Sequence, residues 1–314
     1  MIYILILLGF LMLIYGGNVL VDGAVAVARR MKVSPLLIGL TLVGFGTSTP
    51  ELMTSLFAAS MDAEGIAVGN VVGSNIANIL LVLGVAAVIS AIHVNKASFK
   101  RDGLFLTIST VVLVIALLWG RIGFVLGAIM CATLAYYVYY SYQTEKKHSS
   151  HEEKEIETPH NHKANHHELG FSVAKTIVGI VLTIAGARVL VTNSVVLAER
   201  WGVSETIIGL TVVALGTSLP ELVTSIVASL KKHSDLALGN VIGSNIYNAL
   251  FILGVTALFV PVKVPANIVI DVAIMVGVTG LLMYFGHKGK LAKSTGWLFC
   301  VLYALYVVYL ACSA

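Results

Sequence analysis

The sequence predicts an all-α integral membrane protein with ten transmembrane helices, arranged as two five-helix repeats of inverted topology. Three observations lead to this fold class. Only 11% of the 314 residues are charged and 58% are hydrophobic, whereas a soluble domain needs about 25% charged residues to cover its surface. Apolar runs of about 20 residues, long enough to cross a bilayer, recur along the chain. The two halves of the sequence also resemble each other.

An internal repeat relates the halves. A shift of 170 residues aligns residues 9–94 with 179–264 without a gap, and 28 of the 50 positions in 38–87 are identical to those in 208–257. The segment GTSTPE at 46–51 returns as GTSLPE at 216–221, and GNVVGSNIAN at 69–78 returns as GNVIGSNIYN at 239–248. Shared lipid composition cannot produce such identity, so the repeat indicates a gene duplication.

The apolar runs divide each half into five predicted helices. They are expected at residues 2–28, 34–60, 65–90, 103–119 and 122–142, and at 171–198, 204–230, 236–260, 266–286 and 295–312. The predicted domains are a first repeat at 1–142, a polar linker at 143–170 and a second repeat at 171–314. Residues 143–168 contain six of the nine histidines and six of the sixteen acidic residues without apolar periodicity, which predicts a disordered tether.

The basic residues set the orientation. With the N-terminus outside, the predicted inner loops carry eleven Lys and Arg residues and the outer loops carry three, in agreement with the positive-inside rule. We therefore expect a multi-pass protein of the cell membrane with both termini outside, the linker in the cytoplasm, and lipid as its surroundings. The net charge of +4 reflects this topology and does not indicate nucleic-acid binding.

Two glutamates lie in the middle of otherwise apolar helices, Glu51 and Glu221. Each costs about 3 kcal/mol at a helix centre, and an ionisable group at that depth indicates function. Since they occupy equivalent repeat positions, we expect them to face each other near the midplane. Pro50 and Pro220 precede them and should break both helices, because proline lacks an amide donor and clashes with the preceding turn.

Neutral oxygen ligands surround the two glutamates in the sequence. Hydroxyl groups lie beside each break, and polar residues at i, i+4 and i+8 form one stripe on the following helix: Thr47, Ser48, Thr217 and Ser218, then Asn70, Ser74 and Asn78 with Asn240, Ser244 and Asn248. Such hard ligands suit calcium, sodium or magnesium, and two carboxylates neutralise one divalent ion. Arg188 aligns with Asn18 and stands outside this symmetric set, so a snorkelling or structural role is favoured over one in the ion pathway.

The doubled motifs GTSxPE and GNxxGSNIxN resemble the α-repeats of sodium/calcium exchangers in the cation/calcium antiporter superfamily, most closely the compact prokaryotic members. The resemblance implies that helices 2, 3, 7 and 8 surround the ions and that helices 1 and 6 slide against them. It implies a calcium site made by the carboxylates of Glu51 and Glu221 with the carbonyls of Thr47 and Thr217. It also implies two sodium sites and two central amides: Ser48, Ser74 and the Gly44 carbonyl; Ser218, Ser244 and the Ala214 carbonyl; and Asn78 with Asn248.

The expected activity is antiport of Ca²⁺ against Na⁺ by a monomeric transporter that is not an enzyme and has no cofactor beyond the transported ions. The related proton-coupled antiporters typically carry an amide-containing GNxxE, so the hydroxyl groups here favour sodium. A calcium/proton antiporter, an antiporter of another divalent ion, and a channel or ion sensor that uses the linker remain alternatives. Several members of the family that the chain resembles carry Asp where this chain has Asn248. The lack of this third carboxylate predicts exchange that does not require potassium.

Overall fold

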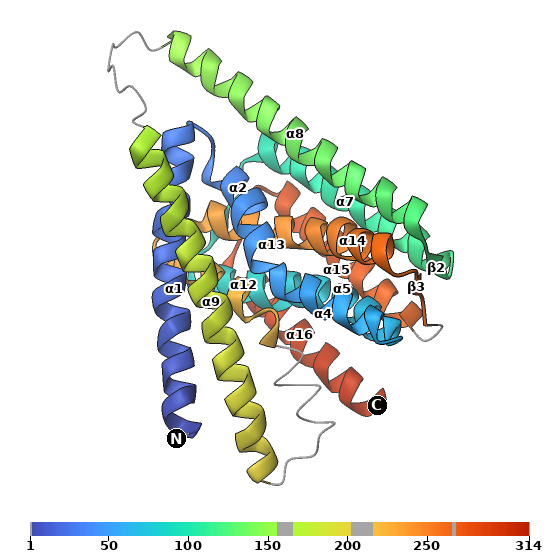
Figure 1. The fold of residues 1–314 in the computed structure, drawn as a ribbon. Coiled ribbons are helices and arrows are strands. Elements are labelled where there is room, and N and C mark those ends of the chain that lie inside the picture. Colours follow the sequence, from blue (N-terminus) through green and yellow to red (C-terminus); the bar gives the residue numbers. More distant parts are fainter. Residues whose placement is uncertain (1, 156–165, 202–215, 266–267, 314) are drawn as a thin grey trace.

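The architecture was examined in a computed structural model that describes residues 2–155, 166–201, 216–265 and 268–313 (Figure 1). Of residues 146–155, 166–167 and 313 it describes only the backbone. Within the described residues, eight helices are long and apolar enough to cross a membrane, or nine if one bent pair counts as a single span. The predicted class of helical multi-pass membrane protein is thus confirmed. The first part of the predicted helix 204–230 lies outside the described residues.

The first half of the chain contains α-helices and two π-helical segments, η1 and η2. They are α1 (Ile2–Met31), α2 (Pro35–Ile38), η1 (Gly39–Val43), α3 (Gly44–Thr47), α4 (Thr49–Ser60), α5 (Glu64–Ala77), η2 (Asn78–Leu83), α6 (Gly84–Ile89), α7 (Lys96–Leu118) and α8 (Phe124–Glu155). The second half contains α9 (His166–Arg200), α12 (Leu219–Leu230), α13 (Ser234–Tyr247), η4 (Asn248–Ile252), α14 (Leu253–Phe259), α15 (Val269–His287) and α16 (Lys293–Ser313). A π-helical segment begins at both Asn78 and Asn248, and such segments are frequent at functional sites.

Four two-residue strands join the halves to each other. They are β1 (Ile92–His93), β2 (Arg121–Ile122), β3 (Val262–Lys263) and β4 (Lys290–Leu291). β1 pairs with β4 and β2 pairs with β3, both antiparallel. The repeat relates β1 to β3 and β2 to β4, so exchanging the two halves leaves the set of pairings unchanged.

The helices α1 and α9 run side by side as a long pair along one flank of the molecule (Figure 1). Glycines permit their close approach: a Cβ atom on Gly16 would lie 2.8 Å from the backbone nitrogen of Thr183, and one on Gly186 would lie 2.8 Å from that of Leu13. Small residues at such contacts are typical of helix pairs in membranes, where backbones pack without help from the hydrophobic effect. Any larger side chain at Gly16 or Gly186 would push the two helices apart.

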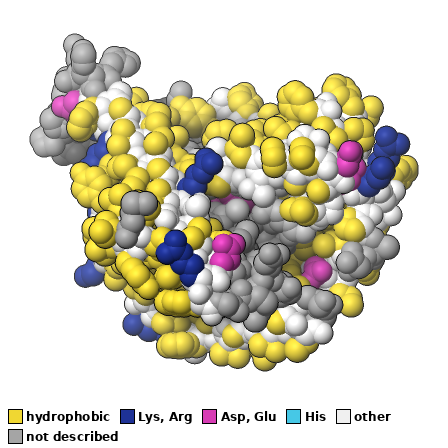
Figure 2. Space-filling model, turned by 60° about the horizontal axis from the view of Figure 1, so that its bottom comes forward, with side chains coloured by type: hydrophobic (Ala, Val, Ile, Leu, Met, Phe, Trp, Pro, Cys, Tyr) yellow, Lys and Arg dark blue, Asp and Glu magenta, His cyan; other side chains and the backbone are white. Residues whose placement is uncertain are grey.

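Two spans form the centre of the molecule. In the most apolar windows of Glu64–Ile89 and Ser234–Phe259, 72% and 83% of the residues are buried, against 33% in α1 and 22% in α9. The peripheral helices instead expose large hydrophobic side chains such as Phe10, Phe171 and Leu305. Figure 2 shows one face on which hydrophobic side chains predominate and charged groups are few. The polar residues of the repeat motifs therefore lie inside, and the outer surface is suited to lipid.

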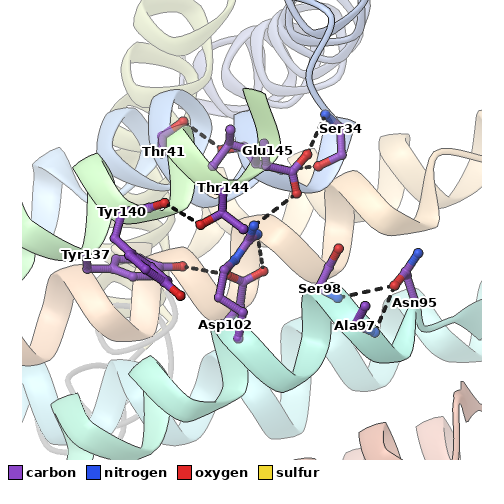
Figure 3. A network of polar contacts seen from close by, with 12 residues as sticks. Ser34, Thr41, Asn95, Ala97, Ser98, Asp102, Tyr137, Tyr140, Thr144 and Glu145 are labelled. Atoms are coloured by element: carbon purple, nitrogen blue, oxygen red, sulfur yellow. Dashed lines mark hydrogen bonds and ion pairs between the residues drawn. The ribbon is translucent and has the colours of Figure 1, made fainter. Parts of the chain in front are cut away.

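The described ends of the predicted linker 143–170 are helical. Helix α8 continues to Glu155, although it was expected to end at residue 142, and α9 begins at His166 instead of residue 171. The side chain of Glu145, which was assigned to the disordered tether, binds two partners: Arg101 Nη1 donates to Oε1 at 3.2 Å, and the backbone amide of Ser34 donates to Oε2 at 3.2 Å (Figure 3). Polar composition without apolar periodicity predicts disorder here, but the Glu145 carboxylate pairs with Arg101 of α7.

A third buried acid was missed by the sequence analysis. Asp102 in α7 is fully buried; Arg101 Nε donates to its Oδ1 at 2.7 Å and Arg101 Nη2 to its Oδ2 at 2.9 Å (Figure 3). Arg101 had been counted as a loop residue because helix 4 was expected to begin at 103, whereas α7 begins at Lys96. Since Asp102 is fully paired, it is part of the scaffold and is unlike Glu51 and Glu221.

Candidate functional site

In both repeats a helix begins directly after the serine that precedes the proline by two residues, and in the first repeat this serine also interrupts the preceding helix. α3 ends at Thr47, α4 begins at Thr49, and the two segments are bent by 42°. The φ and ψ angles are −81° and 5° at Ser48 and −86° and 4° at Ser218, so the two breaks have nearly the same geometry. Pro50 and Pro220 lie in the first turn of the helix that follows, where a missing amide costs nothing. The predicted break before Glu51 is confirmed, and Ser218 has the same backbone geometry, although most of the segment before it lies outside the described residues.

The two glutamates each lie in the first turn of such a helix. This position favours negative charge, because the first amides of a helix have no carbonyl partner and its dipole is positive there. Glu51 is 1% exposed and Glu221 is 0% exposed. Glu221 lies close enough to Glu51 for the two charges to repel each other. The structure therefore brings the two predicted carboxylates together inside the protein.

The serines of the breaks reach across to the opposite glutamate. Ser48 Oγ donates to Glu221 Oε1 at 3.2 Å, and Ser218 lies beside Glu51. The Oε2 atoms of both glutamates are buried without a hydrogen-bond partner among the described residues. Two mutually repelling carboxylates that each leave an oxygen unpaired are costly in a protein interior, and a bound cation would relieve both costs.

Asparagines of the second motif support the glutamate backbones. Asn70 Nδ2 donates to the Glu51 carbonyl at 3.1 Å and to Ser55 Oγ at 2.9 Å. Asn240 Nδ2 makes the equivalent contacts to the Glu221 carbonyl at 3.4 Å and to Ser225 Oγ at 3.1 Å. The sequence stripe thus contains positioning groups as well as candidate ligands. Ser55 and Ser225 were not singled out in the sequence, although they too repeat at the 170-residue interval.

The remaining candidate ligands lie in the same interior with polar atoms to spare. Ser74, Ser244, Asn78 and Asn248 are between 0% and 6% exposed. Ser244 lies beside Glu221, and the unpaired buried atoms include Ser244 Oγ, Asn78 Oδ1 and both amide atoms of Asn248. Asn75 and Asn245, also missed, are buried with unpaired Oδ1 atoms. Their repetition within the GSN segment of both motifs was an available signal.

Gly44, Thr47 and Ala214 are three of the four residues whose backbone carbonyls were expected to bind ions. The Gly44 carbonyl accepts from the Ser48 amide at 3.1 Å, and Gly44 packs so closely on α13 that an added Cβ would lie 3.1 Å from the Ser244 nitrogen. Thr47 is fully buried, with its hydroxyl 3.1 Å from the Val43 carbonyl and 3.3 Å from Asn240 Oδ1. Ala214 lies outside the described residues.

Thr217 differs from its repeat partner Thr47. It is only half-buried and lines a cavity of about 360 Å³ between α4 and α9. Pro50 and Met53 of α4 and Ala187 and Arg188 of α9 also line this α4–α9 cavity. The cavity thus reaches Pro50 and Thr217, which directly precede Glu51 and Ser218 in the sequence.

The donor set contains oxygen atoms and neither thiolate nor imidazole groups. Among the described residues, no three His, Cys, Asp or Glu side chains come together in a way that could hold a metal ion. Two carboxylates with neutral hydroxyl, amide and carbonyl oxygens form a site for a hard cation, because calcium and sodium prefer such oxygens in flexible geometry. The residues present therefore fit the ions expected from the sequence.

Comparison with known proteins gives one consistent result. The family model described as sodium/calcium exchanger protein matches residues 1–143 and 171–311. The chain is 33% identical over 342 residues to the sodium/calcium exchanger MaX1 of Methanosarcina acetivorans, covering 98% of this chain and 97% of that protein. It is 36% identical over 265 residues to the inner membrane protein YrbG of Escherichia coli, covering 82% and 79%. Its fold is similar to a structure of the sodium-calcium exchanger NCX_Mj, with a TM-score of 0.85, 32% identity, and 98% and 99% of the two chains covered.

Proposed function

The chain belongs to the sodium/calcium exchanger family, and from this premise we propose that it exchanges Ca²⁺ for Na⁺ across the cell membrane by alternating access. The observation that carries the proposal is the pair of buried carboxylates, Glu51 and Glu221, each with one unpaired oxygen. Their two negative charges match one calcium ion. When calcium leaves, sodium ions would neutralise the same charges, so that the carboxylates are never left bare in the membrane interior.

The assignment of ligands follows the breaks in the helices. Glu51 and Glu221, together with the carbonyls of Thr47 and Thr217, would hold calcium at the midplane. Ser48 and Ser74 with the Gly44 carbonyl would form one sodium site, and Ser218 and Ser244 with the Ala214 carbonyl would form the other. Asn78 and Asn248 would line the centre. In support, Ser48 already contacts Glu221, and Ser244 Oγ, Asn78 Oδ1 and Asn248 Oδ1 are buried and unpaired.

Movement of the α1 and α9 pair would provide alternating access. Under the proposed inverted topology, with ten helices and both termini outside, α4 and α9 both run outward, so the α4–α9 cavity opens to the outside. The opposite side, where α1 packs on α12, would be closed to the cytoplasm. The repeats at 1–142 and 171–314 would each contribute one sliding helix and half of the ion site, so that a monomer suffices for exchange.

The decisive experiment is uptake of radioactive calcium into sodium-loaded vesicles that contain the purified protein. We expect uptake only with an outward sodium gradient at fixed pH, and no change when potassium is replaced by choline. Uptake driven by a pH gradient without sodium would replace this proposal with calcium/proton antiport. Flux that needs no counter-ion would indicate a channel. Competition by manganese or magnesium would define the preference among divalent ions.

A further inference from the structure

The α4–α9 cavity contains one charged side chain among the described residues that line it, that of Arg188. Arg188 lies in the middle of α9, its side chain is exposed in the cavity, and it forms no ion pair or hydrogen bond with any described residue. An unpaired cation at this depth of a membrane-spanning helix is costly and indicates a function. A snorkelling role, which the sequence favoured, does not explain why the residue lines the cavity.

The position of the Arg188 charge can affect ion binding because the cavity borders residues next to the proposed ion site. Thr217 and Pro50 line the same cavity, and they adjoin Ser218 and Glu51. A fixed charge in a cleft with low-dielectric walls changes the local concentration of ions more strongly than the same charge in water. Its effect on an ion is proportional to the charge of that ion. If it lowers the occupancy by sodium by a given factor, it lowers that by calcium by the square of the factor.

We propose that Arg188 is a specificity-determining residue of the outer access route, which lowers the affinity of the outward-facing site for Ca²⁺ more than for Na⁺. This inference rests on the proposed exchange function. It gives the charge a purpose: a calcium ion that arrives from the cytoplasm would dissociate to the outside more readily. The inner counterpart of Arg188 is the neutral Asn18, whose Nδ2 donates to the Ile14 carbonyl at 2.9 Å. The repulsion therefore acts on one side only.

A charge series at position 188 tests the proposal. In right-side-out vesicles, Arg188→Gln should lower the external half-saturating concentration by about threefold for sodium and about ninefold for calcium, as the square relation requires. Arg188→Glu should lower both further, with calcium again changing more. Arg188→Lys should behave as the wild type. Arg200→Gln serves as the matched control, because it removes the same charge from the same helix about 18 Å away, beyond the screening length of about 8 Å at physiological salt.

Two further readouts separate an electrostatic role from a structural one. The calcium effect of Arg188→Gln should shrink when ionic strength is raised with choline chloride, and calcium affinity measured from the cytoplasmic side should stay unchanged. Equal changes for sodium and calcium, or unchanged external affinities in both the Gln and Glu variants, would overturn the role of Arg188 while leaving exchange intact. Absence of sodium-driven calcium flux in the wild type would instead overturn the proposed function itself.

Discussion

The two repeats make unlike contacts on the two sides of the ion site. On one side α1 packs on α12: an added Cβ on Gly17 would lie 3.0 Å from Val223 Cγ1, and Lys231 Nζ donates to Asp22 Oδ1 at 2.7 Å. On the other side the equivalent residues Ala187 and Met53 line the α4–α9 cavity. At these matched positions, similar sequences thus form a close contact on one side and line a cavity on the other. A transporter that alternates between two states needs this difference, and reversing it would convert one state into the other.

The centre of the molecule, in contrast, obeys the repeat. The breaks at Ser48 and Ser218, and the contacts of Asn70 and Asn240 with the glutamate backbones, are nearly the same in both halves. The difference between the symmetric centre and the asymmetric flanks separates two kinds of residue. Changes at the centre should affect ion binding equally from either half, whereas changes at the flanks should act on one side only.

The largest effect is expected at the centre. Glu51→Gln and Glu221→Gln should each lower calcium exchange by about a hundredfold or more, because removing one buried charged partner typically costs about 3–5 kcal/mol. The two losses should be similar in size. The measurement is sodium-driven calcium uptake at equal amounts of protein, with elution as a single species as the control for folding. Normal exchange by either variant would contradict the proposed site, and loss in only one of them would break its symmetry.

An intermediate effect is expected where α1 and α9 meet the core. Leucine in place of Gly17 has no room against Val223, so Gly17→Leu should push α1 from α12 and open the closed side about tenfold more often, since overpacking costs about 1–3 kcal/mol. Leucine in place of Ala187 fits into the α4–α9 cavity and should obstruct its closure, which lowers turnover without opening the α1–α12 side. The opening is measured as the labelling rate of Val21→Cys, a fully buried residue one turn from Gly17 on α1.

Both leucine variants are made in a background in which Cys131, Cys300 and Cys312 are replaced by alanine, so that only the introduced thiol reacts. Gly17→Ala provides a graded control, because one methyl group should open the α1–α12 side less than leucine does. If Gly17→Leu and Ala187→Leu changed the labelling rate in the same direction, the two sides would not be alternatives and the comparison between them would fail.

A smaller effect is expected from the hydroxyl groups at the breaks. Ser48→Ala and Ser218→Ala should raise the sodium concentration needed for exchange by about fivefold, as expected for loss of one neutral ligand worth about 1 kcal/mol. Ser74→Ala and Ser244→Ala should act in the same way. Calcium affinity should change less, because the carboxylates make the larger contribution to that site. A tenfold loss of calcium affinity with unchanged sodium dependence would show that the division of ligands is wrong.

The burial of the two glutamates at the centre could be predicted from the sequence, because each signal for it occurs in both repeats. Membrane-spanning helices follow from apolar length, the breaks from proline, and the candidate ligands from the repeat, and all three were local properties of the chain. The contacts of Glu145 could not be predicted from composition, because its partners Arg101 and Ser34 lie far away in the sequence and meet it only in the folded chain. Asp102 was not predicted as a buried acid, because helix 4 was expected to begin at residue 103, which places Asp102 and its partner Arg101 in a loop. The cavity at Arg188 could not be predicted, because it depends on how α4 and α9 pack against each other and no local property of the sequence reports that packing.

The smallest expected effect concerns the ion pairs of Asp22, which two lysines contact. Lys175 Nζ of α9 lies 3.7 Å from Asp22 Oδ2, within the α1 and α9 pair, whereas Lys231 Nζ lies 2.7 Å from Oδ1 and belongs to the turn after α12. If α1 and α9 move together, opening of the α1–α12 side breaks only the contact with Lys231. The cavity side has no equivalent ion pair, because Met61 and Thr192 stand at the matching positions.

Asp22 is 48% and Lys231 30% exposed, and such pairs contribute about 0.2–1 kcal/mol. Lys231→Gln should therefore raise the labelling rate of Val21→Cys about two- to fourfold. Lys175→Gln removes the same charge and contacts the same carboxylate, but should leave that rate nearly unchanged. Equal increases in the two variants would mean that Asp22 needs only a positive neighbour, and that the ion pair does not hold the side closed.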